Sequence, residues 1–180
     1  MSSRPQLKHL GIYVNDIVRM ERFYTRVFDL MVTDRGKVAR LGNRNIVFMS
    51  GAVDAHHQVV LIDGKDPASG PSVLFQISFH LEDLAGLRKV RDMMKEENVA
   101  DISPISHGNA WSIYASDPEG NGLEAYLDTP WHVAQPHGRP FDLSLPDEQI
   151  RAQTESIVRA DPTFKMRADW MQSQKLALAD

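Results

Sequence analysis

The alternation of hydrophobic and polar positions in residues 8–17 recurs in residues 75–84. In each segment polar and apolar residues alternate, as in a strand with one buried face, and an acidic turn then opens an amphipathic helix. Asp16 aligns with Asp83 at an offset of 67 positions. Each predicted helix carries one apolar stripe; the stripes consist of Ile17, Met20, Phe23, Tyr24, Val27 and Phe28, and of Leu84, Leu87, Val90 and Met94.

Three short strand-like runs follow each predicted helix. They cover residues 37–42, 45–50 and 56–63 in the first half, and 100–106, 110–116 and 121–128 in the second. Each half therefore reads β-α-β-β-β, and one order of elements repeated at one offset indicates a duplicated module. The modules span residues 5–63 and 73–129, and the linker between them, residues 64–72, is rich in turn formers.

The composition changes after the second module. Residues 129–146 hold four prolines and read as an extended arm. A helix is predicted over 144–158, with Ser144 near its cap and Pro146 early, and a second helix over 162–178. We expect these segments to cover the core or to make a subunit contact. The chain then divides into a two-module domain and a helical extension, residues 1–129 and 130–180.

The bulk composition is that of an ordinary globular protein, with 180 residues, 42% hydrophobic and 24% charged, and a net charge of -4. The mild acidity argues against nucleic-acid binding, which needs a basic surface. The absence of cysteine excludes disulfides, thiolate metal sites and cysteine nucleophiles. The first residues lack the apolar core of a signal peptide, and no apolar run approaches membrane-spanning length, so we expect a cytoplasmic protein with no membrane partner.

Two positions in each half carry candidate chemistry, one in the first strand and one in the last. The offset aligns His9 with Gln76 and His57 with Glu124. If the halves pack around a pseudo-twofold axis, two imidazoles, an amide oxygen and a carboxylate would meet, a set that suits Fe(II), Mn(II), Ni(II) or Zn(II). Without that convergence Glu124 is an ordinary solvent-facing carboxylate and the histidines are exposed strand residues. The residue pattern alone leaves both interpretations open.

Tyr114 and His107 are the next candidates. Tyr114 lies on the strand before Glu124, and its phenol either points toward the same site or packs in the sheet with its hydroxyl at the edge. His107 stands in a Gly-containing loop between strands, where a titratable imidazole either reaches the site or is solvated.

Four stretches of the chain, HLGIYVNDIVRMERFYTRVFDL, HHQVVL, SFHLEDLAGL and HGNAWSIYASDPEGNGLEAYLD, resemble the vicinal oxygen chelate superfamily of glyoxalase I, fosfomycin-resistance and bleomycin-resistance proteins and extradiol dioxygenases. The resemblance is greatest to one-domain extradiol, catechol-type dioxygenases, since a His-Gly pair is followed seven residues after the His by Tyr114, then by DPEGN and Glu124. It implies two βαβββ modules that form a cup-shaped mixed sheet around a metal and substrate site.

The dioxygenase resemblance also implies roles for single residues. His9 and Glu124 would be ligands of Fe(II), the favoured metal, while His57 would lie near bound oxygen as a second-sphere histidine. His107 and Tyr114 would hydrogen-bond the substrate, an aromatic diol, and move protons. Gln76 departs from the pattern, because these enzymes carry a second ligand histidine at that position. The facial triad of two His and one carboxylate is then incomplete unless His57 completes it.

The departure at Gln76 leaves two alternatives. Glyoxalase-type members use all four aligned positions as ligands and accept Gln among them, so His9, His57, Gln76 and Glu124 would hold a metal in an isomerase or lyase. A metal-free binding protein of the bleomycin-resistance type is the third interpretation. A homodimer is expected because the arm and the C-terminal helices extend past the repeated module.

Overall fold

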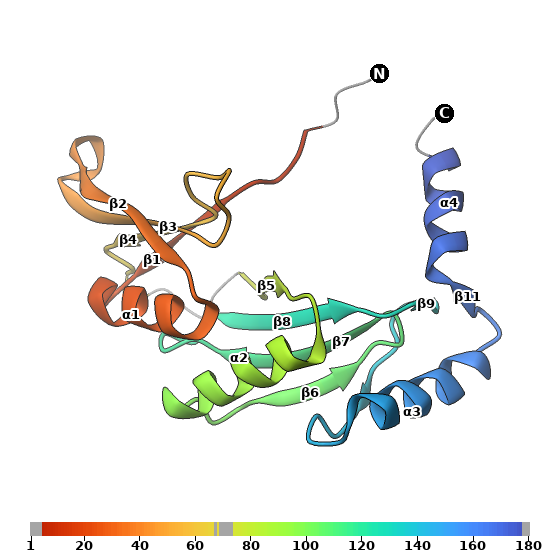
Figure 1. The fold of residues 1–180 in the computed structure, drawn as a ribbon. Helices are drawn as coiled ribbons and strands as arrows, with labels where there is room; N and C mark the ends of the chain where they lie inside the picture. The colour runs from red at the N-terminus through yellow and green to blue at the C-terminus, as the bar shows by residue number, and fades with distance from the viewer. Residues whose placement is uncertain (1–4, 67, 69–73, 178–180) are drawn as a thin grey trace. The chain divides into compact units, whose positions relative to one another are not determined.

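The computed structural model of the chain describes residues 5–66, 68 and 74–177. Its contacts divide the chain into two compact units (Figure 1). Unit 1 comprises residues 1–75 and 117–121, and unit 2 comprises residues 76–116 and 122–180. Of the predicted linker, residues 67 and 69–72 lie outside the described residues.

Unit 1 contains a four-stranded mixed sheet with one helix. Its strands run in the order β1-β4-β3-β2, with β1 and β4 parallel and the other pairs antiparallel. The elements are β1 (Leu10–Val14), α1 (Ile17–Phe28), β2 (Met31–Val38), the 3-10 helix η1 (Ala39–Leu41), β3 (Arg44–Ser50) and β4 (Val59–Asp63).

Unit 2 repeats this order. Its sheet runs β10-β6-β7-β8-β5, with β5 and β8 parallel. The elements of the second module are β5 (Ile77–His80), α2 (Leu84–Glu96), β6 (Ser103–Ser106), β7 (Ala110–Ser116) and β8 (Gly122–Asp128). The β-α-β-β-β order of both halves and the α+β class with mixed sheets are thereby confirmed.

The two module helices form where the sequence pattern requires them. Asp16 caps α1, its Oδ1 accepting from the Arg19 N–H at 2.9 Å, and Asp83 caps α2 by accepting from the Gly86 N–H at 2.7 Å. Their buried residues are Met20, Phe23, Tyr24 and Val27, and Leu84, Leu87, Val90 and Met94. These stripes have the three- and four-residue spacing of one helix face, so each helix covers one side of its sheet.

The extension folds with unit 2. Strand β10 (Arg139–Pro140) pairs with β6, and β11 (Lys165–Met166) pairs with β9 (Trp131–His132). The helices are α3 (Asp147–Arg159) and α4 (Arg167–Ala177). Within the described ranges, no helix has the length and apolar character needed to cross a membrane.

Several expected element boundaries are wrong; the strands expected to begin at residues 37, 56 and 100 begin at Met31, Val59 and Ser103. Ser144 does not cap α3: its hydroxyl donates to Asp142, and the helix starts after Pro146. The predicted helix over 162–178 is shorter, because residues 165–166 pair in a strand before α4 begins; residue 178 lies outside the described residues. The predicted strand over 37–42 ends at Val38, since η1 and the positive φ angles of Gly42 and Asn43 turn the chain there.

The offset of 67 holds for the first strands and fails for the last. Leu10 lies opposite Val59 in the β1·β4 ladder, and Ile77, 67 positions after Leu10, lies opposite Leu123 in the β5·β8 ladder. Leu123 follows Val59 by 64 positions, because the second module has fewer residues between its first and last strands: β6 has four residues where β2 has eight. His9 and Gln76 therefore remain equivalent, whereas the expected equivalence of His57 and Glu124 is wrong.

Candidate functional site

A polar row crosses the sheet of unit 2 on the face away from α2. Glu124 on β8 lies opposite Ser78 on β5 and opposite Tyr114 on β7. The neighbouring positions on β8, Leu123 and Ala125, belong to the buried core. Alternation along the strand thus directs Glu124 to the other face, where its residue is only 9% exposed.

Four hydrogen-bond donors surround the Glu124 carboxylate. Oε1 accepts from the hydroxyls of Ser112 and Tyr114, each at 2.8 Å. Oε2 accepts from the Ser78 hydroxyl at 2.6 Å and from the Gln76 amide at 2.8 Å. A carboxylate has about four acceptor positions, so these donors satisfy it in full. Glu124 is a buried, oriented carboxylate and not a solvated surface charge.

His107 extends this network away from the sheet. Its Nε2 lies 2.8 Å from the Tyr114 hydroxyl, and its Nδ1 lies 2.6 Å from the backbone carbonyl of His137. A carbonyl oxygen can only accept, so Nδ1 carries hydrogen and Nε2 is the nitrogen that meets Tyr114. The structure thus joins Glu124, Tyr114 and His107 by hydrogen bonds.

Glu124, Tyr114, His107 and the carbonyl of His137 form a hydrogen-bonded chain, and the number of hydrogens in it decides how many of its bonds form at once. It ends on acceptors at both ends, the ionised carboxylate of Glu124 and the carbonyl of His137. Its three hydrogen bonds need three hydrogens, whereas a neutral imidazole and a phenol together supply two. All three hydrogen bonds form only when this hydrogen-bonded chain holds one proton more than neutral His107 and Tyr114 supply. The arrangement is therefore able to take a proton from a neighbouring molecule and to return it.

Tyr114 enters this chain as a phenol and not as a phenolate. Burial raises its pKa, and the hydrogen bond and negative charge of Glu124 raise the pKa further. Tyr114 accordingly keeps its hydrogen at neutral pH and donates it to one of its two neighbours.

Unit 1 brings together His9 and His57, the other two predicted site residues. Their ring centroids lie 4.3 Å apart, and the Phe48 ring packs against His57 at 5.2 Å. The Nδ1 atoms of His56 and His57 are 2.9 Å apart. Desolvation lowers the pKa of His57, and the neighbouring His9 and His56 lower the pKa further. At neutral pH His57 is therefore an uncharged imidazole, the form that binds metals or accepts a proton.

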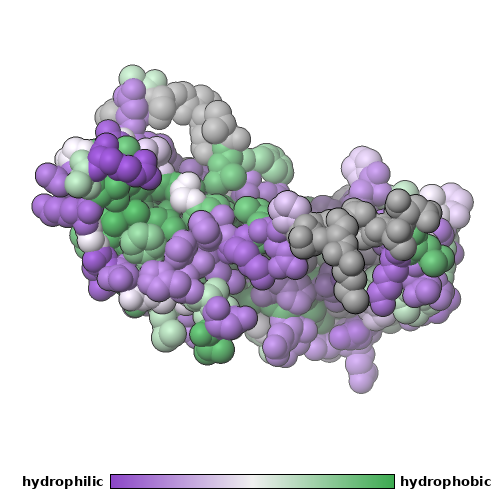
Figure 2. Space-filling view, turned by 90° about the horizontal axis from the view of Figure 1, so that it is seen from above, coloured by the Kyte–Doolittle hydropathy of each residue, from purple (hydrophilic) through white to green (hydrophobic). Residues whose placement is uncertain are grey.

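Unit 1 also exposes apolar surface. Figure 2 shows a green area at the left, over the strands of unit 1, with purple polar residues around it. The large exposed apolar residues of unit 1 are Leu7, Tyr13, Val18, Met31, Val53 and Phe75. Of these features, the contact with Phe48 is the one that places an apolar ring directly against an imidazole.

The four predicted metal ligands are divided between the units. Unit 1 holds His9 and His57, and unit 2 holds Gln76 and Glu124. Neither unit by itself, in the part that the structure describes, gathers three His, Asp or Glu side chains able to hold a metal ion. The donor chemistry nevertheless fits a divalent cation, because an uncharged imidazole and a carboxylate oriented by hydrogen bonds are typical ligands. Ligation by Glu124 would take one acceptor position from a present donor.

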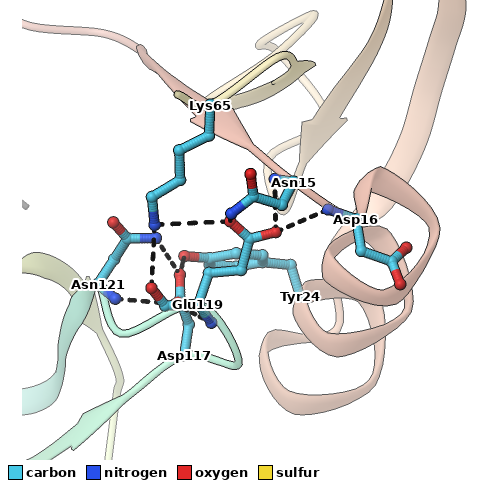
Figure 3. Close-up of polar contacts among 7 residues, drawn as sticks. All are labelled: Asn15, Asp16, Tyr24, Lys65, Asp117, Glu119 and Asn121. Carbon is cyan, nitrogen blue, oxygen red and sulfur yellow. Dashed lines mark hydrogen bonds and ion pairs between the residues drawn. The ribbon is translucent and has the colours of Figure 1, made fainter. Parts of the chain in front are cut away.

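Sequence reasoning missed the structural role of the DPEGN turn. Asp117 is buried and accepts from the Tyr24 hydroxyl of α1 at 2.9 Å (Figure 3). It also accepts from the N–H groups of Glu119 and Asn121, and from the Asn121 side-chain amide at 2.8 Å. Burial raises the pKa of Tyr24, and the negative charge of Asp117 raises the pKa further. An acidic residue opening a turn with Asn four positions on was the signal available in the sequence.

Glu119, in the same turn, contacts the start of α1. Its carboxylate accepts from the backbone N–H groups of Asn15 and Asp16 at 2.7 and 2.8 Å, and Lys65 lies 3.6 Å from it (Figure 3). A negative charge at a helix N-terminus satisfies unpaired N–H groups and complements the helix dipole. The acids of this turn are thus engaged in holding unit 1 together.

The model of the Glyoxalase/Bleomycin resistance protein/Dioxygenase superfamily matches residues 6–125, which is about two-thirds of the chain. The chain belongs to this superfamily. Among curated proteins, it is 23% identical over 171 residues to biphenyl-2,3-diol 1,2-dioxygenase 2 of Rhodococcus globerulus, and the match covers 86% of each chain. The resemblance seen in the sequence is thereby confirmed at the level of the superfamily.

Solved structures of superfamily members share the fold. A glyoxylase/bleomycin resistance protein/dioxygenase domain from Frankia sp. EAN1pec aligns with a TM-score of 0.59 at 19% identity, covering 71% of this chain and 94% of that one. The fosfomycin resistance protein FosX of Listeria monocytogenes, in complex with Mn(II) and sulfate, aligns with a TM-score of 0.54 at 16% identity, covering 71% and 95%. At these identities the likeness concerns the fold.

Proposed function

We propose that the protein is a metal-dependent enzyme that opens the ring of a catechol-like aromatic diol beside its two hydroxyl groups, using dioxygen. The observation that carries the proposal is the contact of Tyr114 with both Glu124 and His107. These are the residues to which the extradiol pattern gives ligand and proton-transfer roles. The relative from Rhodococcus globerulus, a dioxygenase of biphenyl-2,3-diol by name, supports the same substrate class.

His9 and Glu124 are the proposed metal ligands, with His57 or Gln76 as the third. A divalent ion held there, Fe(II) by preference and Mn(II), Ni(II) or Zn(II) otherwise, would supply chelation of two vicinal oxygens and the redox chemistry with dioxygen. The hydrogen bonds of Ser78 and Ser112 to Glu124 orient the carboxylate, as outer-shell donors do for metal ligands.

His107 and Tyr114 are the proposed proton-transfer residues. An aromatic diol must lose protons to chelate, and the chain from Glu124 to His137 has room for one proton beyond those of neutral His107 and Tyr114. Tyr114, whose pKa is raised, would donate its hydrogen to a substrate oxygen. His107 would take up the substrate proton through Nε2 and return it after ring opening.

His57 is the proposed acid or base on the unit 1 side. Its lowered pKa keeps it uncharged at neutral pH, so it would accept a proton before it could donate one. Phe48, packed against its ring, suits an aromatic substrate.

Gln76 favours one second candidate, a glyoxalase-type isomerase or lyase. It stands where the extradiol pattern has a ligand histidine, and its amide nitrogen donates to Glu124. With the nitrogen so engaged, the amide oxygen would be the atom able to bind a metal. In that enzyme Glu124 would move a proton of the substrate, and a bound metal would supply polarisation of the vicinal oxygens.

Oxygen consumption after anaerobic purification and Fe(II) loading tests the proposed reaction. We expect uptake of dioxygen with catechol or biphenyl-2,3-diol as substrate, and loss of uptake in a His107→Gln variant that retains its metal. Activity supported by Ni(II) or Zn(II) without oxygen uptake would replace ring cleavage by the isomerase or lyase. No bound metal, with melting unchanged by chelators, would leave a small-molecule binding protein.

A Gln76→His variant tests directly whether residue 76 is a metal ligand. A severalfold change in metal affinity would place side chain 76 at the ion. Unchanged affinity would exclude Gln76 from the ligand set and leave His57 as the third ligand.

A further inference from the structure

The loop that carries His107 is held by residues of the C-terminal extension. This loop, residues 107–109, joins β6 and β7, and the superfamily match ends at residue 125, before the extension begins. The carbonyl of His137 accepts the Nδ1 hydrogen of His107 at 2.6 Å. A residue from outside the matched region thus contacts the imidazole itself.

Gln135 ties the two ends of this contact together. Its Nε2 donates to the backbone carbonyl of His107 at 2.9 Å, and its Oε1 accepts from the backbone N–H of His137 at 3.0 Å. The side-chain amide of Gln135 therefore bridges the backbone of His107 and the backbone of His137, whose carbonyl accepts the Nδ1 hydrogen. Both of its polar ends are used, which fixes its orientation.

The middle of the loop is equally constrained. Thr129 donates its hydroxyl to the carbonyl of Gly108 at 2.6 Å. Gly108 has a φ of 74°, and a Cβ built there would come within 2.7 Å of Val133 and 2.9 Å of Val158. Only glycine fits this conformation and this space. The extension therefore packs directly against the backbone of the loop.

We propose that Gln135 is a positioning residue, which holds the His137 carbonyl on Nδ1 of His107 and so keeps Nε2 directed at Tyr114. A histidine presents different chemistry at its two nitrogens, and the partner of one nitrogen decides what the other does. The hydrogen-bonded chain from Glu124 to His137 either holds the hydrogens of neutral His107 and Tyr114 or has one proton more. In both states Nδ1 keeps its hydrogen. Because of this, Nε2 is the nitrogen that gains and loses the additional proton. Proton transfer to and from a substrate at Nε2 rests on the proposed function, whereas the Nδ1–H tautomer of His107 does not.

Nitrogen NMR of the protein without metal or substrate tests this assignment. Long-range ¹H–¹⁵N correlations distinguish protonated from unprotonated ring nitrogens, and a His107→Gln variant identifies the His107 signals among those of the seven histidines. We expect a protonated Nδ1 at neutral pH, with slowed exchange of its hydrogen. A wild-type His107 that carries hydrogen on Nε2 alone would overturn the proposal without any variant.

Two substitutions then test Gln135 itself. Gln135→Ala removes both hydrogen bonds, and Gln135→Glu keeps the acceptor for His137 but loses the donor for His107. We expect the Nδ1 hydrogen to exchange at least about tenfold faster in both, and the Nε2 tautomer to become populated. The control is Gln149→Ala, at an exposed position on α3 of the same unit. Equal exchange in wild type, Gln135→Ala and the control would refute the positioning role.

This result is separable from the ring-cleavage assay. The NMR measurement needs no metal, substrate or turnover, so a failed enzyme assay leaves the tautomer result standing. Conversely, an unaltered tautomer in Gln135→Ala would refute the positioning role while leaving the proposed reaction unaffected.

Discussion

Tyr114 donates to Glu124 across the β7·β8 ladder, at a distance of 2.8 Å and directly opposite it in the register. In Tyr114→Phe the carboxylate loses one of four donors, and Nε2 of His107 loses its partner. We expect turnover to fall by about 10²- to 10⁴-fold, the usual contribution of a proton-transfer residue, while metal affinity changes little. Oxygen-uptake kinetics and metal titration check the two parts.

The matched control for this variant is Tyr126→Phe, which removes a phenol from the same face of the sheet without changing the four donors to Glu124. A Tyr114→Phe enzyme with wild-type turnover would remove Tyr114 from the proton-transfer scheme. A loss of metal binding as large as the loss of turnover would make it a residue that supports the ligand instead.

Tyr24 and Asp117 give a prediction about stability. Tyr24 is fully buried, and Tyr24→Phe leaves the packing intact but deprives a buried carboxylate of one donor. We expect a loss of about 1.5–3 kcal/mol in the free energy of unfolding, measured in urea. In the control, Tyr13→Phe at an exposed tyrosine, the change should stay within about 0.5 kcal/mol. Equal effects of the two substitutions would contradict the role of the turn.

The sequence predicted the fold from its repetition. Capping residues Asp16 and Asp83 and the two apolar stripes follow local rules, because a cap and a helix face depend on neighbours three or four positions away. The equivalence of His57 and Glu124 failed, because the last strand is reached only after elements whose lengths differ between the modules, such as β2 and β6. An offset carried across several elements accumulates their differences in length.

The sequence pattern singled out some residues of the candidate site and gave no sign of others. The pattern singled out His107, Tyr114 and Glu124, which the structure joins by hydrogen bonds. It gave no sign of Gln135, which lies 28 positions from His107 and contacts its backbone carbonyl. Every residue type has a backbone carbonyl, so a side chain that binds one cannot be recognised from the residue that it contacts.

His132 gives a prediction about pH. Its ring stacks on Trp170 of α4 with centroids 4.8 Å apart. Burial lowers its pKa, and the positive charges of Lys165 and Arg167 lower the pKa further. The folded state therefore binds fewer protons than the unfolded state just below the ordinary histidine pKa of about 6.5, and stability must fall as the pH drops through that range.

A His132→Phe variant isolates this contribution, since phenylalanine keeps the stack and does not titrate. We expect Tm to fall less between about pH 7 and pH 5 in the variant than in the wild type, as followed by circular dichroism. His57 retains its own lowered pKa, so some dependence remains. Identical pH profiles for the two proteins would show that His132 is not linked to stability.

Glu119 gives a prediction about the start of α1. In Glu119→Gln the neutral amide keeps one acceptor for the N–H groups of Asn15 and Asp16, but loses the charge near the helix terminus and Lys65. We expect about 0.5–2 kcal/mol less stability, an effect that shrinks in high salt. Urea unfolding at low and high ionic strength measures it. A loss that does not depend on salt would contradict an electrostatic origin.

Anaerobic metal titration is the most direct test of the proposal that His9 and Glu124 hold one divalent ion. With Fe(II) or Mn(II), we expect one ion per chain, and affinity at least about tenfold weaker in His9→Ala and in Glu124→Gln, each shown by circular dichroism to be folded. The control, Glu148→Gln on the exposed start of α3, should bind as the wild type does. An absence of binding in the wild type, or binding that neither ligand substitution weakens, would contradict the proposal.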